Sequence, residues 1–165
     1  MKAAILTQPS RRARRIQGDA YLKFQLAPGN SALLDMKQVQ EVLLLPLQRL
    51  TPLPNMPPHI LGLMNRRSRV IWVIDLPQML NLPNLDSNRR QHSLVLLRVA
   101  DITLGLAVQQ IEGIVWLSPD RTQSAPTNVT PAMVAYLRGC VLEKQDLLLV
   151  LDGAAIAQSA IPDSL

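Results

Sequence analysis

Residues 60–76 read ILGLMNRRSRVIWVIDL, and this stretch decides the fold class. Two apolar runs, residues 62–65 and 70–75, flank a short polar segment, a pattern that predicts a β-hairpin. The turn of this hairpin carries three arginines, Arg66, Arg67 and Arg69. Guanidinium groups placed so close together repel one another, and they must therefore face water or an acidic partner.

Further hairpins are expected on both sides of this one. Alternating or continuous apolar residues predict strands over residues 21–26, 32–36, 93–99, 102–108, 111–117, 139–142 and 147–151. Short strands about ten residues apart favour an all-β fold, either a sandwich or small barrels. Two brief helices are expected at residues 76–80 and 153–159, because Asp75 and Asp152 precede them and can accept the free N–H groups of a first turn.

The length and composition predict a folded chain without a membrane-spanning segment. The chain has 165 residues, of which 48% are hydrophobic and 18% charged. No uncharged apolar run reaches the roughly 18 residues that cross a bilayer. The N-terminus lacks the apolar core of a signal peptide, so we expect a cytoplasmic protein. Cys140 is the only cysteine and is expected to be a small buried side chain.

The formal net charge of +5 lies in the N-terminal segment. Residues 1–18 contain five basic residues and no acid, whereas residues 19–165 contain twelve residues of each sign. We therefore expect a disordered basic tail over residues 1–18, a folded domain over 19–162 and a short tail over 163–165. The basic tail also leaves a second class of function open, a protein that binds nucleic acid or a membrane surface.

The sequence contains no motif for catalysis or cofactor binding. Its seven glycines never lie two apart, so neither a dinucleotide loop nor a phosphate loop can be formed. His59 and His92 have no metal ligand at a suitable spacing, and both are expected at the surface or at a sheet edge. We expect no enzymatic activity, no cofactor and no metal.

Residues 39–76 resemble the CheW family of chemotaxis coupling proteins. The matching features are Val39-Gln40-Glu41-Val42, a proline-rich link over 54–58, Gly62-Leu63-Met64-Asn65-Arg66-Arg67-Ser68, and an apolar strand that ends at Asp75-Leu76. Weaker similarity extends the resemblance to about residues 20–160. This stretch, with its proline-rich link, resembles the CheW-like proteins of pilus-based motility systems, including phototactic ones, more than those of the flagellar kind.

Three positions depart from the family pattern. Ser68 stands where glycine is usual, so a turn that requires a positive φ forms at some energetic cost. Trp72 stands where proline is usual and is either a core residue or a partner anchor, with the core favoured. Gln109 stands where aspartate is common, which removes a charge.

The resemblance implies two small five-stranded SH3-like barrels with short helices. It also implies a non-catalytic adaptor that couples a chemoreceptor or photoreceptor to a CheA-type histidine kinase. In such an adaptor the barrel ends would dock on the kinase, and a groove between the barrels would receive the cytoplasmic tip of a methyl-accepting receptor. A homologue that only scaffolds kinase arrays is the alternative within the same fold. Neither nucleic-acid binding nor direct membrane insertion is implied.

The family motif also suggests which residues contact partners. Arg67 matches the family arginine, and Val39 with Glu41 forms a second contact patch on the facing strand. Gly62, Asn65 and Asp75 are expected to shape the hairpin and cap the following helix. The full set of candidate partner-binding residues is Val39, Glu41, Arg66, Arg67, Ser68, Arg69, Val108 and Gly139.

Overall fold

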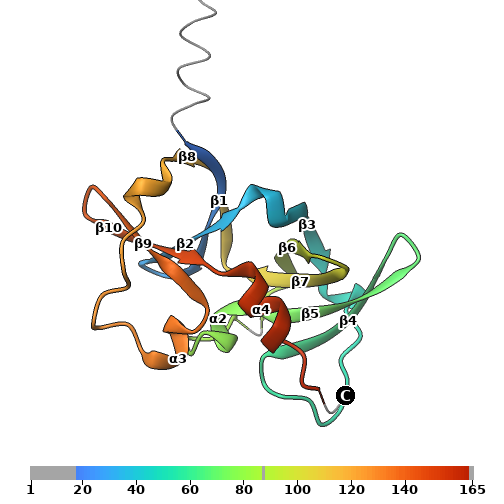
Figure 1. Ribbon diagram of the computed structural model, residues 1–165. Coiled ribbons are helices and arrows are strands. Elements are labelled where there is room, and N and C mark those ends of the chain that lie inside the picture. The colour runs from blue at the N-terminus through green and yellow to red at the C-terminus, as the bar shows by residue number, and fades with distance from the viewer. Residues whose placement is uncertain (1–17, 87, 164–165) are drawn as a thin grey trace, which may run out of the picture.

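The structure is a computed structural model that describes residues 18–86 and 88–163. These residues form two curled five-stranded sheets (Figure 1). Sheet A has the order β8-β1-β2-β10-β9 and contains β1 (Asp19–Ala27), β2 (Asn30–Asp35), β8 (Gln110–Leu117), β9 (Leu137–Glu143) and β10 (Asp146–Leu151). Sheet B has the order β3-β6-β7-β5-β4 and contains β3 (Val39–Pro46), β4 (Ile60–Arg66), β5 (Arg69–Asp75), β6 (Gln91–Val99) and β7 (Ile102–Val108). The predicted all-β class with two five-stranded units is confirmed.

Short helices connect the strands. They are η1 (Met36–Gln38), η2 (Leu47–Arg49), α2 (Leu76–Met79), η3 (Pro119–Arg121), α3 (Pro131–Val134) and α4 (Gly153–Ser159). The two predicted aspartate caps are confirmed, because an oxygen of Asp75 accepts from the Gln78 N–H at 3.0 Å and an oxygen of Asp152 from the Ala155 N–H at 3.1 Å. Among the described residues, no helix has the length and apolar character needed to cross a membrane.

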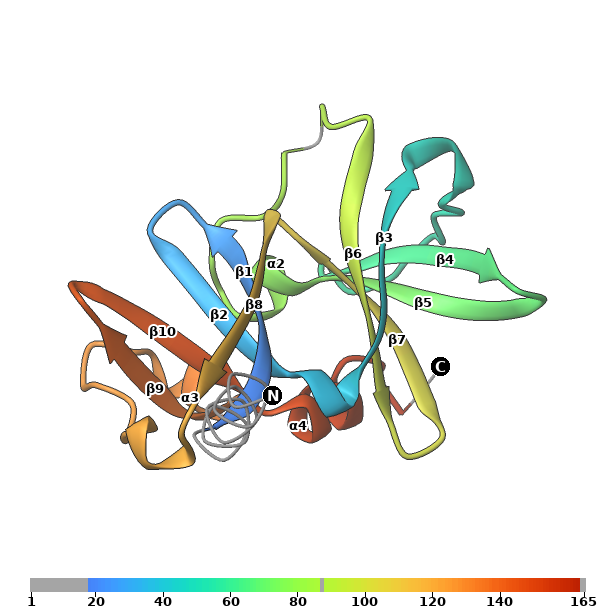
Figure 2. The same cartoon turned by 90° about the horizontal axis from the view of Figure 1, so that it is seen from above.

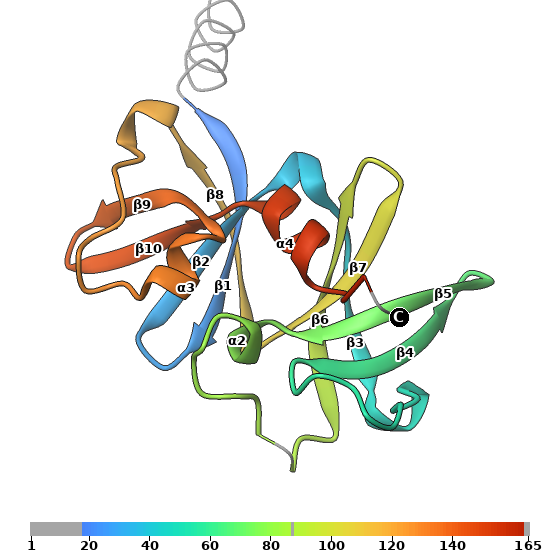
Figure 3. The same cartoon turned by 60° about the horizontal axis from the view of Figure 1, so that its bottom comes forward.

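The two halves of the chain repeat one order of elements that the letters of the sequence do not reveal. Each half runs through an antiparallel hairpin (β1–β2 or β6–β7), a strand that crosses to the other sheet (β3 or β8), a second hairpin (β4–β5 or β9–β10) and an aspartate-capped helix. Figures 2 and 3 show that each sheet combines strands from both halves. The two halves of the chain therefore cannot separate without breaking strand pairs.

Each sheet is closed by the segment that follows its crossing strand. Thr51, after β3, exchanges two backbone hydrogen bonds of 2.8 Å with Leu63 of β4. Gln123, after β8, makes the same pair of 2.8 Å bonds with Cys140 of β9. Because β3 and β4 are opposite edges of sheet B, and β8 and β9 are opposite edges of sheet A, these bonds bring the edges of each sheet together.

A continuous core lies between the sheets. Its largest cluster includes Phe24 and Leu34 from sheet A, Ile74 and Leu106 from sheet B, and Ile156 from α4, all fully buried. Trp72 packs against this cluster and is half-buried, which agrees with the core interpretation of this residue. Cys140 is buried, as predicted.

The prediction for His92 is wrong. This side chain is buried, with 5% of its surface exposed, because β6 lies inside sheet B between β3 and β7 and not at an edge. Burial, followed by the charge of Arg89, lowers its pKa. His59 is half-buried, and its Nε2 donates to the Ala160 carbonyl at 2.7 Å. The predicted basic tail lies outside the described residues, apart from Gly18, as do residues 164–165 of the short C-terminal tail.

Candidate functional site

The arginine hairpin ends in a two-residue turn with left-handed backbone. Arg66 of β4 pairs with Arg69 of β5, and the residues between them, Arg67 and Ser68, have φ values of 52° and 65°. Two consecutive left-handed residues are the pattern of a type I′ turn, which glycine and asparagine normally favour. Arginine and serine each cost about 1 kcal/mol in this conformation. The tight turn therefore fixes the backbone positions from which the Arg67 and Ser68 side chains extend.

Gly62 fixes the base of the same hairpin. Its φ is 145°, and a Cβ at this position would overlap the carbonyl oxygen of Thr51. The strand pairing shifts register between Ile60 and Gly62, which marks a bulge. Gly62 therefore shapes the base of the hairpin through a close backbone approach. Asn65 lies opposite Val70 farther out along the hairpin.

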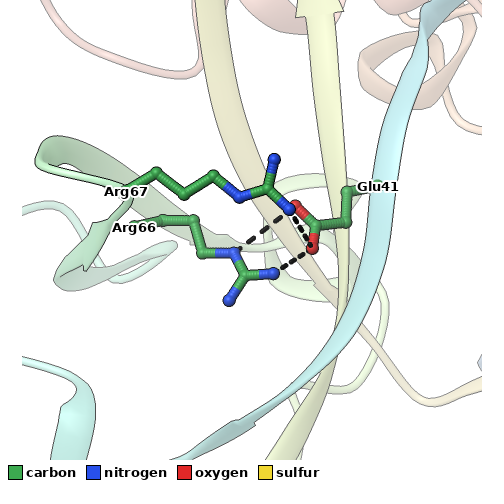
Figure 4. A network of polar contacts seen from close by, with 3 residues as sticks. All are labelled: Glu41, Arg66 and Arg67. Atoms are coloured by element: carbon green, nitrogen blue, oxygen red, sulfur yellow. Dashed lines mark hydrogen bonds and ion pairs between the residues drawn. The ribbon is translucent and has the colours of Figure 1, made fainter.

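Glu41 ties the arginine hairpin to the crossing strand β3. Its carboxylate accepts a hydrogen bond from Nη2 of Arg66 and faces Nη2 of Arg67 at 3.9 Å (Figure 4). The Arg66 hydrogen bond has the largest effect and holds the pKa of Glu41 below its ordinary value; burial opposes it, and the charges of Arg66 and then Arg67 add to the lowering. Because β3 and β4 are opposite edges of sheet B, this ion pair brings together two patches that the sequence places 25 residues apart.

The three arginines differ in side-chain exposure and in their contacts with Glu41. The side chain of Arg66 is 35% exposed and is held by Glu41, whereas that of Arg67 is 76% exposed and has only the long contact. Arg69 is exposed and makes no ion pair within the described part of the chain. Arg67 and Arg69 are therefore the arginines that can bind an acidic group outside the molecule.

The remaining candidate residues are less accessible. Val39 is half-buried against the core, and Val108 of β7 is fully buried, so Val108 supports the fold and presents no surface. Gly139 is also buried, and a Cβ there would overlap the carbonyl oxygen of Gln123. Gly139 thus occupies the place in sheet A that Gly62 occupies in sheet B.

An exposed apolar row on each crossing strand is a feature that sequence reasoning missed. Val42 and Leu44 are exposed on β3, and Ile114 and Trp116 are exposed on β8, where Trp116 has 66% of its surface accessible. The strands alternate half-buried and exposed residues, but their apolar residues fall on both faces. The period-2 pattern that would have identified an outward face is hidden by this composition.

The described residues contain no set of side chains suited to bind a metal ion. Within residues 18–86 and 88–163, no three histidine, cysteine, aspartate or glutamate side chains gather where they could hold a metal ion. The polar groups of the site are instead paired with one another or directed outward at the end of the hairpin. This arrangement suits contact with another macromolecule.

Comparisons with known proteins agree with the fold and the hairpin motif. The family described as "CheW-like domain" matches residues 20–160. The chemotaxis protein CheW of Bacillus subtilis (strain 168) is 29% identical over 121 residues, covering 70% of this chain and 77% of that protein. The chemotaxis protein CheW of Treponema pallidum (strain Nichols) is 29% identical over 122 residues, covering 72% and 71%. The crystal structure of the scaffolding protein TtCheW from Thermoanaerobacter tengcongensis has a TM-score of 0.71 at 20% identity, covering 82% of this chain and 90% of that one, and it shows the same fold.

Proposed function

We propose that this chain, which belongs to the CheW family, is a non-catalytic adaptor. It couples chemoreceptors or photoreceptors to a CheA-type histidine kinase. Its relatives from Bacillus subtilis and Treponema pallidum carry the name of chemotaxis proteins. An adaptor of this kind acts only through its surfaces. Which surfaces it offers is therefore the central structural question.

The observation that carries the proposal is the exposed Arg67. It stands at the position of the family arginine, on a turn whose base is fixed by Gly62 and whose neighbour Arg66 is held by Glu41. A side chain carried on a fixed backbone loses less freedom on binding than one on a flexible loop. We assign the hairpin end, formed by residues 66–69, to contact with the regulatory domain of the kinase.

The exposed apolar rows of β3 and β8 support a second contact. Trp116 and Leu44 are large apolar side chains in water, and aromatic residues of this kind often supply the anchors of an interface. The tip of a chemoreceptor is a helical hairpin whose apolar positions could cover them. We assign these rows, together with the half-buried Val39 of the same strand β3, to the receptor.

Signal transfer follows from differential binding at the two contacts. A receptor state can change kinase activity only by as much as the adaptor binds the two arrangements with different free energies. Glu41 lies on β3, the proposed receptor side, and contacts the arginine hairpin, the proposed kinase side. This carboxylate therefore links the strand that carries the proposed receptor row to the hairpin end proposed for the kinase.

The proposed biological setting is pilus-based motility, including phototaxis. It is supported by the proline-rich link over residues 54–58, which is most similar to proteins of those systems. Capture of this protein's partners from an extract of its own cells would identify the kinase and the receptor. Recovery of a flagellar kinase would contradict the setting and leave the adaptor role intact.

Arg67→Ala is the direct test of the adaptor function. We expect the variant to melt within about 2 °C of the parent protein, since an exposed arginine contributes little to stability. It should lose at least about tenfold in co-sedimentation with receptor membranes and the kinase, as an interface anchor does. Arg98→Ala is the matched control, an exposed arginine on β6 of the same sheet. Equal binding by Arg67→Ala and Arg98→Ala would remove Arg67 from the interface.

A further inference from the structure

A hollow open to solvent lies where the pairing of β3 with β6 ends. The last paired residues of the two strands are Pro46 and Gln91. Beyond them, η2 and the segment before β6 line the hollow, and the Leu47 N–H donates to the Arg90 carbonyl at 2.9 Å, which joins these two walls. The hollow has a volume of about 430 Å³ and is lined by Leu47, Gln48, Asn88, Arg89 and Arg90.

This hollow is separate from the contacts proposed above. Figures 2 and 3 show the end of β3 and the start of β6 side by side, while the β4–β5 hairpin projects away from both. The exposed residues Val42 and Leu44 of β3 do not line the hollow either. A molecule bound there would leave the arginine turn and these two apolar side chains uncovered.

The basic charge at the hollow is not balanced by acid. Neither Arg89 nor Arg90 makes an ion pair with any residue that the structure describes, and the same holds for the exposed Arg49 of η2. The nearest acid along the chain, Asp86, uses a carboxylate oxygen to accept from the Asn88 N–H at 2.9 Å. The two segments that line the hollow thus carry three positive charges and no acid.

Arg89 is held in position by a neutral partner. Its Nη2 donates to the Gln109 backbone carbonyl at 2.8 Å, and its Nη1 donates to the Gln109 side-chain oxygen at 3.4 Å. A guanidinium group has five N–H donors, and these contacts use only two of them. Because an amide has no net charge, Gln109 orients Arg89 without cancelling its charge.

A buried histidine senses the charge of Arg89. Burial, followed by the Arg89 charge, lowers the pKa of His92, and the charge of Asp75 opposes this lowering. An anion bound to Arg89 would remove part of the lowering. The His92 pKa is therefore an internal reporter of anion binding at the hollow.

The lining suits a small molecule that carries a phosphate group. Guanidinium groups bind phosphate oxygens through paired N–H···O bonds, and a phosphate offers three such acceptor oxygens where a carboxylate offers two. The exposed amides of Gln48 and Asn88 can donate to further oxygens. Leu47 has 43% of its surface exposed and provides an apolar wall. The volume of the hollow lies within the range of small-molecule sites.

We propose that this hollow binds the phosphate group of a small phosphate ester, with Arg89 and Arg90 contacting its oxygens and Leu47 its apolar part. The phosphate can belong to a soluble ester or to the headgroup of a phospholipid, and experiment separates these two sources. The inference goes beyond the adaptor function and does not depend on it.

Pyrophosphate is the soluble probe, and calorimetric titration of the full chain measures its binding. Arg89→Gln/Arg90→Gln should weaken binding at least about tenfold, the effect of losing hydrogen bonds to a charged group. Arg11→Gln/Arg12→Gln is the matched control, since it removes the same charge from the N-terminal segment. This control should bind within about twofold of the parent protein. At saturation, NMR titration should show a raised His92 pKa in the parent and in the control.

A charge added beside Arg89 tests the same contact without removing an arginine. Gln109→Glu replaces the amide that Arg89 contacts with a carboxylate, so it should weaken pyrophosphate binding at least about tenfold. Gln110→Glu is the control, because it adds the same charge on an exposed side chain that makes no hydrogen bond to Arg89 among the described residues. It should weaken binding by no more than about threefold.

Vesicles of phosphatidylglycerol test the headgroup as the source of the phosphate. Co-sedimentation that falls in Arg89→Gln/Arg90→Gln and persists in Arg11→Gln/Arg12→Gln would assign the hollow to a lipid headgroup. Pyrophosphate binding without such co-sedimentation would assign it to a soluble ester. Both results support a phosphate site.

Four results would overturn the proposal. They are a parent protein that binds neither probe, a control Arg11→Gln/Arg12→Gln that loses binding as fully as the hollow variant, equal weakening by Gln109→Glu and Gln110→Glu, and a His92 pKa that saturation leaves unchanged. Circular dichroism melting checks that each variant folds. If Arg89→Gln/Arg90→Gln does not fold, Arg90→Gln alone, at an exposed position, takes its place and should weaken binding at least about threefold.

Discussion

The β4–β5 and β9–β10 hairpins share one backbone design and differ in the groups they present. Gly62 and Gly139 stand at matching places, and each leaves room for a carbonyl oxygen, that of Thr51 or of Gln123. A crossing strand precedes each hairpin, and an aspartate-capped helix follows each one. The comparison teaches that the positions needed for close backbone contact are repeated, whereas the turn residues, which that contact does not constrain, differ in charge.

Only one of the two hairpins is tied back to its crossing strand. Glu41 follows the register shift of β3 and binds Arg66. Gly113 follows the corresponding register shift of β8 and has no side chain with which to bind Glu143. The arginine end is therefore held by a contact between two side chains, whereas the acidic end of the β9–β10 hairpin receives, among the described residues, a hydrogen bond from Arg121 Nη2 to the Leu142 carbonyl at 3.1 Å.

The largest expected effect tests the shared backbone design. Gly62→Ala and Gly139→Ala should each lower the free energy of unfolding by about 3 kcal/mol, because the added Cβ overlaps a backbone oxygen and the positive φ disfavours alanine. Urea unfolding measures this. Gly29→Ala is the control, since its φ of 80° is also left-handed but nothing lies within 4 Å of the added Cβ. It should cost about 1 kcal/mol. Similar losses in all three variants would show that the close approach is unimportant.

A smaller effect separates the two helix caps. Asp152→Ala should lower the free energy of unfolding by about 1 kcal/mol, the usual value for a lost cap. Asp75→Ala should cost about 2 kcal/mol, because the buried Asp75 carboxylate also accepts from the Leu85 N–H at 3.2 Å, and that donor would be left without a partner. Denaturant unfolding of both variants compares them. Equal losses would mean that the Leu85 contact adds nothing.

The smallest expected effect concerns the tie between Glu41 and the arginines. Its lowered pKa means that the ionised carboxylate is favoured in the folded state, so its contribution to stability is present above its ordinary pKa of 4.5. That contribution is lost as the pH falls through the lowered, folded-state pKa. By NMR titration, Arg66→Gln should raise the Glu41 pKa toward its ordinary value more than Arg67→Gln does. If the Glu41 pKa rises more in Arg67→Gln than in Arg66→Gln, then Arg67, and not Arg66, is the main partner of Glu41.

Much of the fold could be predicted from the sequence, because local patterns carry it. Alternation and turn residues indicated the strands, and the position of Asp75 and Asp152 after a strand indicated the two capped helices. The crossing of β3 into sheet B and of β8 into sheet A could not be predicted in this way. It depends on which distant strands pair, and no local pattern records that choice.

The candidate site was predictable only in part. The turn residues 66–69 could be placed by their position between two strands, but the contact between Glu41 and Arg66 joins opposite edges of a sheet. Charge counted along the chain gave near neutrality after residue 18, because the opposite excesses of the two sheets cancel. Val108 and Gly139 were candidates by family resemblance, and the structure shows both as buried positions.

Because β3 and β8 cross between the sheets, the two sheets are completed at different times during translation. Sheet B is built from residues 39–108, so all its strands have been synthesised before the first residue of β8. The β1–β2 hairpin, finished at Asp35, must wait about 75 residues for β8, or roughly 4–15 s at ribosomal speed. During that interval both of its edges lack a neighbour, and such edges are where nascent chains stick to one another. Of the described hairpins, β1–β2 is thus synthesised first, and its β2 edge is covered last, by β10.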